Sequence, residues 1–200
     1  MASLLCMAGC DDDAWTTDPA LEHIYYVGFY KTGTFSDEFN YEIAADGTVR
    51  FRANSKKDTP WTVVGAGGIT GDIPFELHSQ FKYTYDIVSY FFVTNADASS
   101  TLVAGTDYQV IDSSGNALSS SDGKYTLTWS QAQKEGKKII RIQRLSGATG
   151  TLKINTLDPA KGTPSTTEDK YVESTTNNIG NEYELRGLTH DFNKVTVTFR

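Results

Sequence analysis

The stretch YEIAADGTVRFRA, residues 41–53, decides the fold class of this chain. Apolar and polar residues alternate on both sides of Asp46 and Gly47, which is the pattern of two half-buried β-strands. An Asp-Gly pair supplies the positive φ angles that a tight two-residue turn requires. We therefore expect residues 41–44 and 48–53 to pair as the two strands of a hairpin.

The rest of the chain continues this pattern. Short runs rich in β-branched and aromatic residues are separated by Gly, Asn, Asp and Ser, and no stretch of about 12 residues keeps a helical period. In KYTLTW, residues 124–129, Tyr125, Leu127 and Trp129 alternate with polar residues and are expected to face the core. About nine to eleven such runs are enough for two packed sheets, so the sequence predicts an all-β protein with a β-sandwich fold.

The start of the chain carries a motif of a different kind. Met7-Ala8-Gly9-Cys10 resembles the lipobox of bacterial lipoproteins, in which the cysteine is acylated and becomes the new N-terminus. The resemblance implies lipidation at Cys10. Met7 stands where this motif usually has Leu, and no basic segment precedes it, so we expect the leader to begin upstream of Met1. We assign 1–10 to a lipoprotein leader, 11–22 to an acidic tether and 23–200 to a single β-sandwich domain.

Three acidic residues follow the lipobox. Asp11, Asp12 and Asp13 resemble the acidic export signal after the lipidated cysteine of surface lipoproteins in the Bacteroidota. The resemblance implies a lipid-anchored protein on the cell surface, at the outer membrane; the alternative is a solvated acidic linker that no export machinery recognises. Cys6 and Cys10 are the only cysteines, so the predicted domain has neither a disulfide nor a thiolate metal site.

A second resemblance covers about half of the chain. TLVAGTDYQVID, residues 101–112, and KYTLTWSQAQKEGKKIIRIQRL, residues 124–145, resemble Calx-β-type and related immunoglobulin-like domains. NEYELRGLTHDFNKVTVTFR, residues 181–200, is similar to the C-terminal strands of lipoproteins encoded beside glycan-uptake systems of gut Bacteroidota. The resemblance implies an immunoglobulin-like β-sandwich on a surface lipoprotein. No acidic cluster of this chain matches the calcium sites of Calx-β domains residue by residue.

Composition and motifs exclude several classes of function. The formal net charge of −7 argues against nucleic acid as a partner, because affinity for phosphates depends on Lys and Arg. No apolar run approaches the ~18 residues that span a bilayer. His23, His78 and His190 lie far apart and belong to no metal-binding pattern, and the chain has no nucleophile elbow or phosphate-binding loop. We expect neither an enzyme nor a cofactor or metal, although a hydrolase with an unrecognised carboxylate pair is a third possibility.

Exposed aromatic residues are the best candidates for a binding site. Sugar rings present C–H faces that stack on indole rings, and their hydroxyls pair with polar side chains. Trp15 falls in the predicted tether and Trp129 in the predicted core, whereas Trp61 follows Pro60 and precedes a Gly-rich turn. We therefore predict that Trp61 is a ligand-binding residue and that the protein captures glycans, beside outer-membrane uptake proteins.

Two alternatives remain open at this stage. An adhesive or pilus-associated structural protein would bind another protein, and exposed terminal strands would support this because a sheet edge can accept a strand. The basic stretch 134–144 is interpreted either as the polar outer face of a strand or as a docking patch for an acidic partner.

Overall fold

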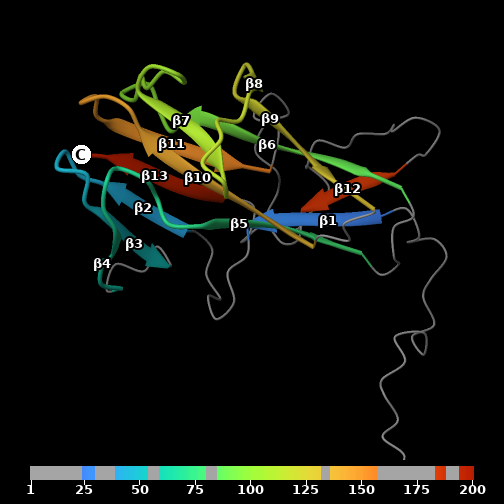
Figure 1. Ribbon diagram of the computed structural model, residues 1–200. Coiled ribbons are helices and arrows are strands. Elements are labelled where there is room, and N and C mark those ends of the chain that lie inside the picture. Colours follow the sequence, from blue (N-terminus) through green and yellow to red (C-terminus); the bar gives the residue numbers. More distant parts are fainter. Residues whose placement is uncertain are drawn as a thin grey trace, which may run out of the picture.

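The computed structural model describes residues 24–29, 39–53, 59–79, 85–131, 136–156, 183–187 and 194–200. The predicted leader and tether, with Cys10, Asp11, Asp12, Asp13 and Trp15, lie outside the described residues. The described part contains thirteen strands in two sheets and no helix (Figure 1). The predicted all-β, immunoglobulin-like β-sandwich is confirmed.

The two sheets differ in size. In spatial order, the first contains the strands β12 (Glu184–Gly187), β1 (Ile24–Phe29), β5 (Ile73–His78), β10 (Lys137–Arg144) and β7 (Tyr108–Asp112). The second contains β4 (Thr62–Gly65), β3 (Val49–Ala53), β2 (Phe39–Ile43), β13 (Lys194–Phe199), β11 (Gly150–Asn155), β6 (Ile87–Asn95), β9 (Lys124–Trp129) and β8 (Ser120–Ser121). The count exceeds the predicted nine to eleven because short strands such as β4 and β8 show no alternation of apolar residues.

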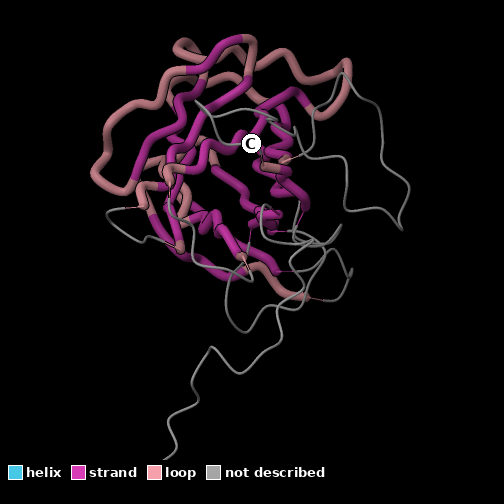
Figure 2. The backbone as a smooth tube through the Cα atoms, turned by 90° about the vertical axis from the view of Figure 1, so that its right-hand side faces the viewer, coloured by secondary structure: helices cyan, strands magenta, loops and turns pink. Residues whose placement is uncertain are grey.

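One apolar core fills the space between the sheets, which lie face to face when viewed along the strands (Figure 2). The predicted alternation in β9 is confirmed, since Tyr125, Leu127 and Trp129 are buried. The Trp129 ring stacks on Phe75 with 6.0 Å between ring centroids, and its Nε1–H donates to the Ser89 hydroxyl over 2.8 Å. A buried indole N–H needs a hydrogen-bond acceptor, and Ser89 supplies it within the core.

The predicted hairpin is confirmed in its strands but not in its turn. β2 and β3 pair antiparallel, with Tyr41 opposite Phe51. The loop has three residues instead of two, because the Ala44 N–H donates to the Thr48 oxygen over 2.9 Å and only Gly47 has a positive φ, 81°. The Asp46 carboxylate accepts the Thr48 N–H, which favours a right-handed turn followed by a left-handed glycine.

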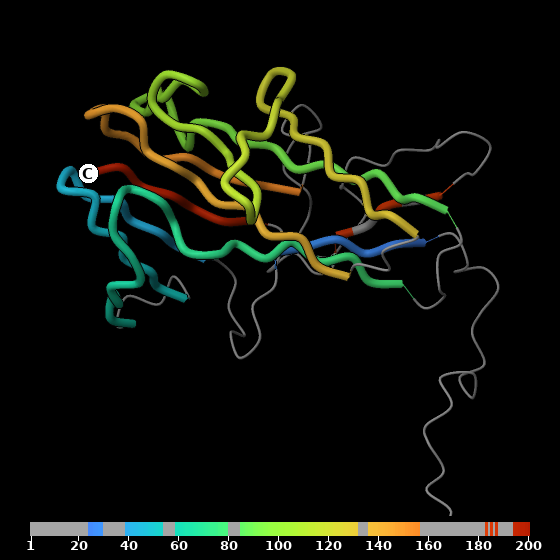
Figure 3. The backbone as a smooth tube through the Cα atoms, viewed as in Figure 1, coloured from blue at the N-terminus to red at the C-terminus, as the bar shows by residue number. Residues whose placement is uncertain are grey.

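The first and last described strands are not sheet edges, so they do not support the adhesive alternative. Among the described strands, β1 comes first and lies between β12 and β5, while β13 comes last and lies between β2 and β11. Both edges of each are hydrogen-bonded, partly through the parallel pairs β1–β12 and β2–β13. The sheet edges are β12, β7, β4 and β8; β3 and β4 form the end of the larger sheet opposite β8 and β9 (Figure 3).

The basic stretch 134–144 does not form a single outer face. Its described residues from Lys137 on form β10, where Lys137 and Arg141 alternate with the buried Ile140 and Ile142 and so face outward. Lys138 lies on the inward side, with its Nζ atom 5.6 Å from the centroid of the buried Trp129 ring. The strand therefore divides its cations between two faces.

Candidate functional site

Trp61 lies directly before β4, at the edge of the eight-stranded sheet, and its side chain is half-buried. The guanidinium carbon of Arg52 stands 4.6 Å from the centroid of the indole ring. The contact follows from the alternation in β3, because Val49 and Phe51 face the core side and Arg50 and Arg52 face outward. A guanidinium stacked on an indole is a cation–π pair, which holds both side chains in place.

Glu42 is the charged centre next to this pair. Its carboxylate lies 3.6 Å from Nη1 of Arg50 and 2.9 Å from Nε of Arg200. The Glu42 side chain is only 12% exposed, whereas Arg50 is 49% and Arg200 67% exposed. One largely buried carboxylate thus pairs with two arginines whose side chains are about half exposed or more. We name the outward-facing set Trp61, Arg50, Arg52, Glu42 and Arg200 the Trp61 face.

Sequence reasoning identified Trp61 but missed the charged residues beside it. The alternation in VRFRA, residues 49–53, already indicated that Arg50 and Arg52 share one side of a strand. The predicted two-residue turn would have placed Glu42 opposite Phe51, whereas the three-residue loop of the structure places it opposite Arg50. Arg200 could not be found in this way, because its position depends on the parallel pairing of β13 with β2.

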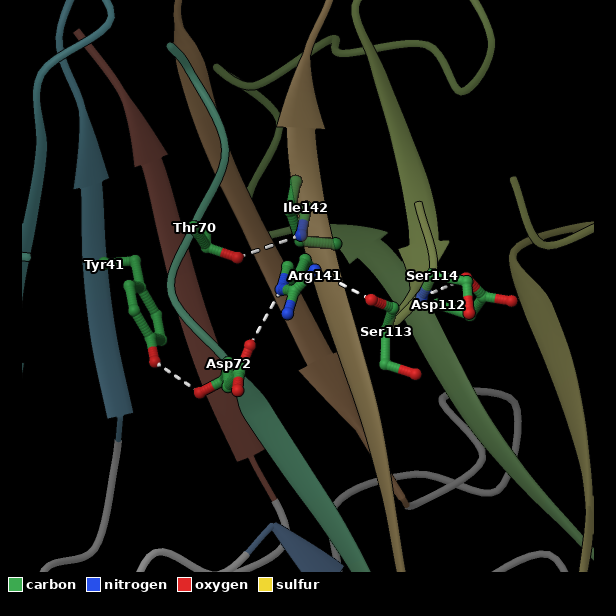
Figure 4. A network of polar contacts seen from close by, with 8 residues as sticks. All are labelled: Tyr41, Thr70, Asp72, Asp112, Ser113, Ser114, Arg141 and Ile142. Carbon is green, nitrogen blue, oxygen red and sulfur yellow. Dashed lines mark hydrogen bonds and ion pairs between the residues drawn. The ribbon is translucent and has the colours of Figure 1, made fainter. Parts of the chain in front are cut away.

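A second polar network joins the two sheets near Asp72 (Figure 4). The Tyr41 hydroxyl donates to the main-chain oxygen of Asp72 over 3.0 Å. Arg141 donates from Nε to the Asp72 carboxylate over 2.7 Å and from Nη1 to the Ser113 oxygen over 3.2 Å. Burial, and secondarily the Asp72 charge, raises the pKa of Tyr41 above its ordinary value, so the phenol stays a neutral donor. We interpret this network as structural, because its groups bind each other.

Asp107, the acidic residue of the AGTDY segment, 104–108, also forms its hydrogen bonds with other residues of the fold. Its carboxylate accepts the Ser146 hydroxyl over 2.6 Å and the Val103 N–H over 2.8 Å. These two hydrogen bonds lower the pKa of Asp107 below its usual range, because both favour the charged form. Asp107 therefore orders the turn before β7.

No metal centre is present in the parts of the chain that the structure describes. The Nε2 atom of His78 lies 3.0 Å from a carboxylate oxygen of Glu76, which forms a pair and not a ligand set. No group of three or more His, Cys, Asp or Glu side chains that could hold a metal ion occurs among those residues. His23 and His190 lie outside them.

The anchor and export signal predicted at Cys10 and Asp11 to Asp13 are untested by the described residues and stay predictions. Within the described ranges, no helix is long and apolar enough to cross a membrane. No family model, no curated protein and no solved structure matches this chain.

Proposed function

We propose that this protein is a noncatalytic cell-surface lipoprotein that captures glycans beside outer-membrane uptake proteins. The observation that carries the proposal is the half-buried Trp61 indole, held under the Arg52 guanidinium at the edge of a sheet. An indole in this position offers an apolar plane to a sugar ring, and Glu42 and Arg50 beside it offer acceptors and donors to hydroxyls. A rigid aromatic plane beside a few polar groups is the usual composition of a small-ligand site.

Glycan retention in affinity gels tests this proposal. We expect Trp61→Ala to abolish retention by any glycan that retains the wild-type chain, while the thermal melt stays unchanged. Val103→Ala is the matched control, because Val103 is 54% exposed and lies in the loop before β7, at an edge of the other sheet. Retention of Trp61→Ala equal to that of wild type would contradict the proposal.

The lipid anchor is a separate part of the proposal. The lipobox-like Met7-Ala8-Gly9-Cys10 and the acidic Asp11, Asp12 and Asp13 support it. We expect labelled palmitate to be incorporated into the wild-type chain and into Cys6→Ser, but not into Cys10→Ser. Equal labelling of all three chains would remove the anchor from the proposal and leave glycan capture untouched.

A second candidate function is adhesion to another protein through a sheet edge. It is favoured by β4, an edge strand on which Val63 is 64% and Val64 42% exposed. An edge of this kind can accept a strand from a partner. Val64→Lys would place a charge on this edge, so adhesion through β4 predicts lost pull-down of a surface protein and unchanged glycan retention.

A further inference from the structure

The outward side of the eight-stranded sheet has a charge opposite to that of the whole chain. The chain carries 25 acidic and 18 basic side chains, a formal net charge of −7. On β2, β3, β11 and β13, the residues that alternate with the buried ones include Arg50, Arg52 and Lys153, and Glu42 is the single carboxylate of these four strands. Arg200 follows β13 and adds a further cation. The described face is therefore cationic on an acidic protein.

The acidic side chains of several described turns are bound within those turns. Asp97 accepts the Ser99 N–H over 2.8 Å, and Asp112 accepts the Ser114 N–H over 2.8 Å. Asp46 and Asp107 accept main-chain N–H groups in the same manner. These carboxylates act as local acceptors in turns but keep their charge, and the nearby Arg50 charge contributes to the lowered pKa of Asp46. On the strands of this face, Glu42 is still the single carboxylate.

Arg52 differs from the arginines that hold the fold together. Arg144 donates hydrogen bonds to four main-chain oxygens, and Arg141 donates to Asp72 and Ser113. For Arg52, the described part of the chain offers no hydrogen-bond acceptor, and its buried Nε atom has no partner. The Trp61 indole thus holds a guanidinium whose hydrogen-bonding capacity the fold itself does not use.

We infer that the Trp61 face binds an acidic glycan, whose carboxylate or sulfate groups pair with Arg50, Arg52 and Arg200; this inference rests on the proposed function. A guanidinium has five N–H donors and no acceptor, so a set of three matches anionic oxygens, whereas neutral hydroxyls both donate and accept. Its planar fork also matches the two oxygens of a carboxylate or sulfate group. Trp61 contacts the apolar face of the sugar ring, and the arginines select its charge.

The test measures binding of the 200-residue chain to immobilised polygalacturonate, heparin and dextran by biolayer interferometry. Polygalacturonate is carboxylated, heparin is sulfated and dextran is neutral. We expect binding to polygalacturonate, heparin or both, no binding to dextran, and weaker binding as salt is added. Arg52→Gln should weaken binding about tenfold or more, because one charge-assisted hydrogen-bonding group is lost. Lys137→Gln, on the outward face of the other sheet, is the matched control and should bind as wild type.

Each other outcome overturns the inference in a distinguishable way. If dextran binds as well as the acidic polymers and Arg52→Gln changes nothing, while Trp61→Ala abolishes binding, the acidic ligand is wrong and glycan capture stands. If no polymer binds, the acidic ligand is wrong, and the affinity gels with other glycans decide on glycan capture. Equal binding of a DNA duplex would show general attraction of charge and would also overturn the inference. If Arg52→Gln melts at a lower temperature than wild type, Arg52→Lys serves in its place. Lysine keeps the charge but lacks the planar guanidinium with its paired donors, so this variant should still bind more weakly than wild type.

Discussion

The Nη1 atom of Arg144 lies 2.7 Å from the main-chain oxygen of Arg200, which joins β10 of the smaller sheet to the residue after β13 of the larger one. The same guanidinium donates to the main-chain oxygens of Ile43, Ser146 and Ala148 over 3.1, 2.7 and 2.9 Å. Arg144 therefore closes one end of the sandwich through the backbone of both sheets.

Replacing Arg144 by Met should destabilise the fold strongly. The apolar stem is kept, but four carbonyl oxygens lose their donor, and an unsatisfied buried group costs about 1–3 kcal/mol. Because several of these oxygens are only partly buried, we expect the free energy of unfolding to fall by about 3 kcal/mol in total. The midpoint of urea unfolding measures the change.

Arg141→Met is the matched control on the same strand. Arg141 forms an ion pair with the exposed carboxylate of Asp72, and such pairs contribute about 0–1 kcal/mol. Its loss should therefore be a small fraction of the loss in Arg144→Met. Equal losses in the two variants would show that the bonds of Arg144 to the backbone do not hold the sheets together.

Tyr183 forms a second connection between the sheets, and Tyr183→Phe tests it. Its hydroxyl accepts the Val88 N–H over 2.9 Å and donates to the Val88 oxygen over 3.1 Å. In the described part of the chain, β11 pairs with β6 only along Phe92–Asn95, so the hydroxyl binds β6 beyond the end of that pairing. Removing it takes one hydrogen bond from each of two main-chain groups, and we expect a loss of about 1–3 kcal/mol in urea unfolding.

Tyr26→Phe controls for the loss of a tyrosine hydroxyl as such. Tyr26 faces outward on β1, and in the described ranges its hydroxyl makes no hydrogen bond. Its removal should leave the urea midpoint unchanged within error. A loss in Tyr26→Phe as large as in Tyr183→Phe would mean that the bonds to Val88 contribute nothing specific.

Local features of this fold were predictable from the sequence. The β2–β3 pairing and the burial of Trp129 follow from side-chain alternation over a few residues, which the sequence displays directly. The acceptor of the Trp129 indole was not predicted, because Ser89 lies 40 positions away and a serine in a strand indicates no partner. Side-chain period determines which face a residue takes, but not which strand lies opposite.

Non-local pairing explains the remaining errors. β13 lies between β2 and β11, and nothing within its own residues distinguishes an interior strand from an edge strand. The same pairing brings Arg200 to Glu42, 158 positions apart, and thereby completes the Trp61 face. Alternation within β3 was thus enough to place Arg50 and Arg52 on one side, whereas the positions of Glu42 and Arg200 depend on the length of the turn and on non-local pairing.

Gly123 tests a close approach between the turn before β9 and the strand β6. It has a φ of 79°, and a Cβ atom added there would lie 2.5 Å from the Val93 oxygen. Gly115 has a φ of 88°, but a Cβ atom added there meets nothing within 4 Å. We expect Gly115→Ala to cost about 1–2 kcal/mol from backbone strain alone. Gly123→Ala should cost about 3 kcal/mol or more, because the clash with backbone adds to the strain.

Thermal melts of the two variants at equal concentration measure this difference. The Val93 N–H also donates to the Gly123 oxygen over 2.8 Å, so a shift of Gly123 away from the clash would stretch that bond. Gly123→Ala should therefore melt well below Gly115→Ala. Equal melting temperatures would show that the turn can move away from β6 at this point without cost.

Stability should decline in acid because of the aspartates in the turns. Hydrogen bonds from the side chain and main chain of Ser99 lower the pKa of Asp97, and those from Asn116 and Ser114 lower the pKa of Asp112. A carboxyl whose pKa is lower in the folded state stabilises the fold above its unfolded pKa of about 3.9, and this contribution is lost as the pH falls through the lowered value. The urea midpoint should thus be level between about pH 7 and 5 and fall below about pH 4.

Asp112→Asn isolates one of these contributions. Asparagine keeps an oxygen that can accept the Ser114 and Asn116 N–H groups, so the turn should form, but the side chain no longer titrates. At pH 7 the variant should be less stable than wild type, because a charged acceptor binds N–H groups more strongly than a neutral one. As the pH falls toward 2, the gap should close, since protonated Asp112 loses the same advantage. Urea midpoints of both chains between pH 7 and 2 measure the gap, and a constant gap would contradict the lowered pKa of Asp112.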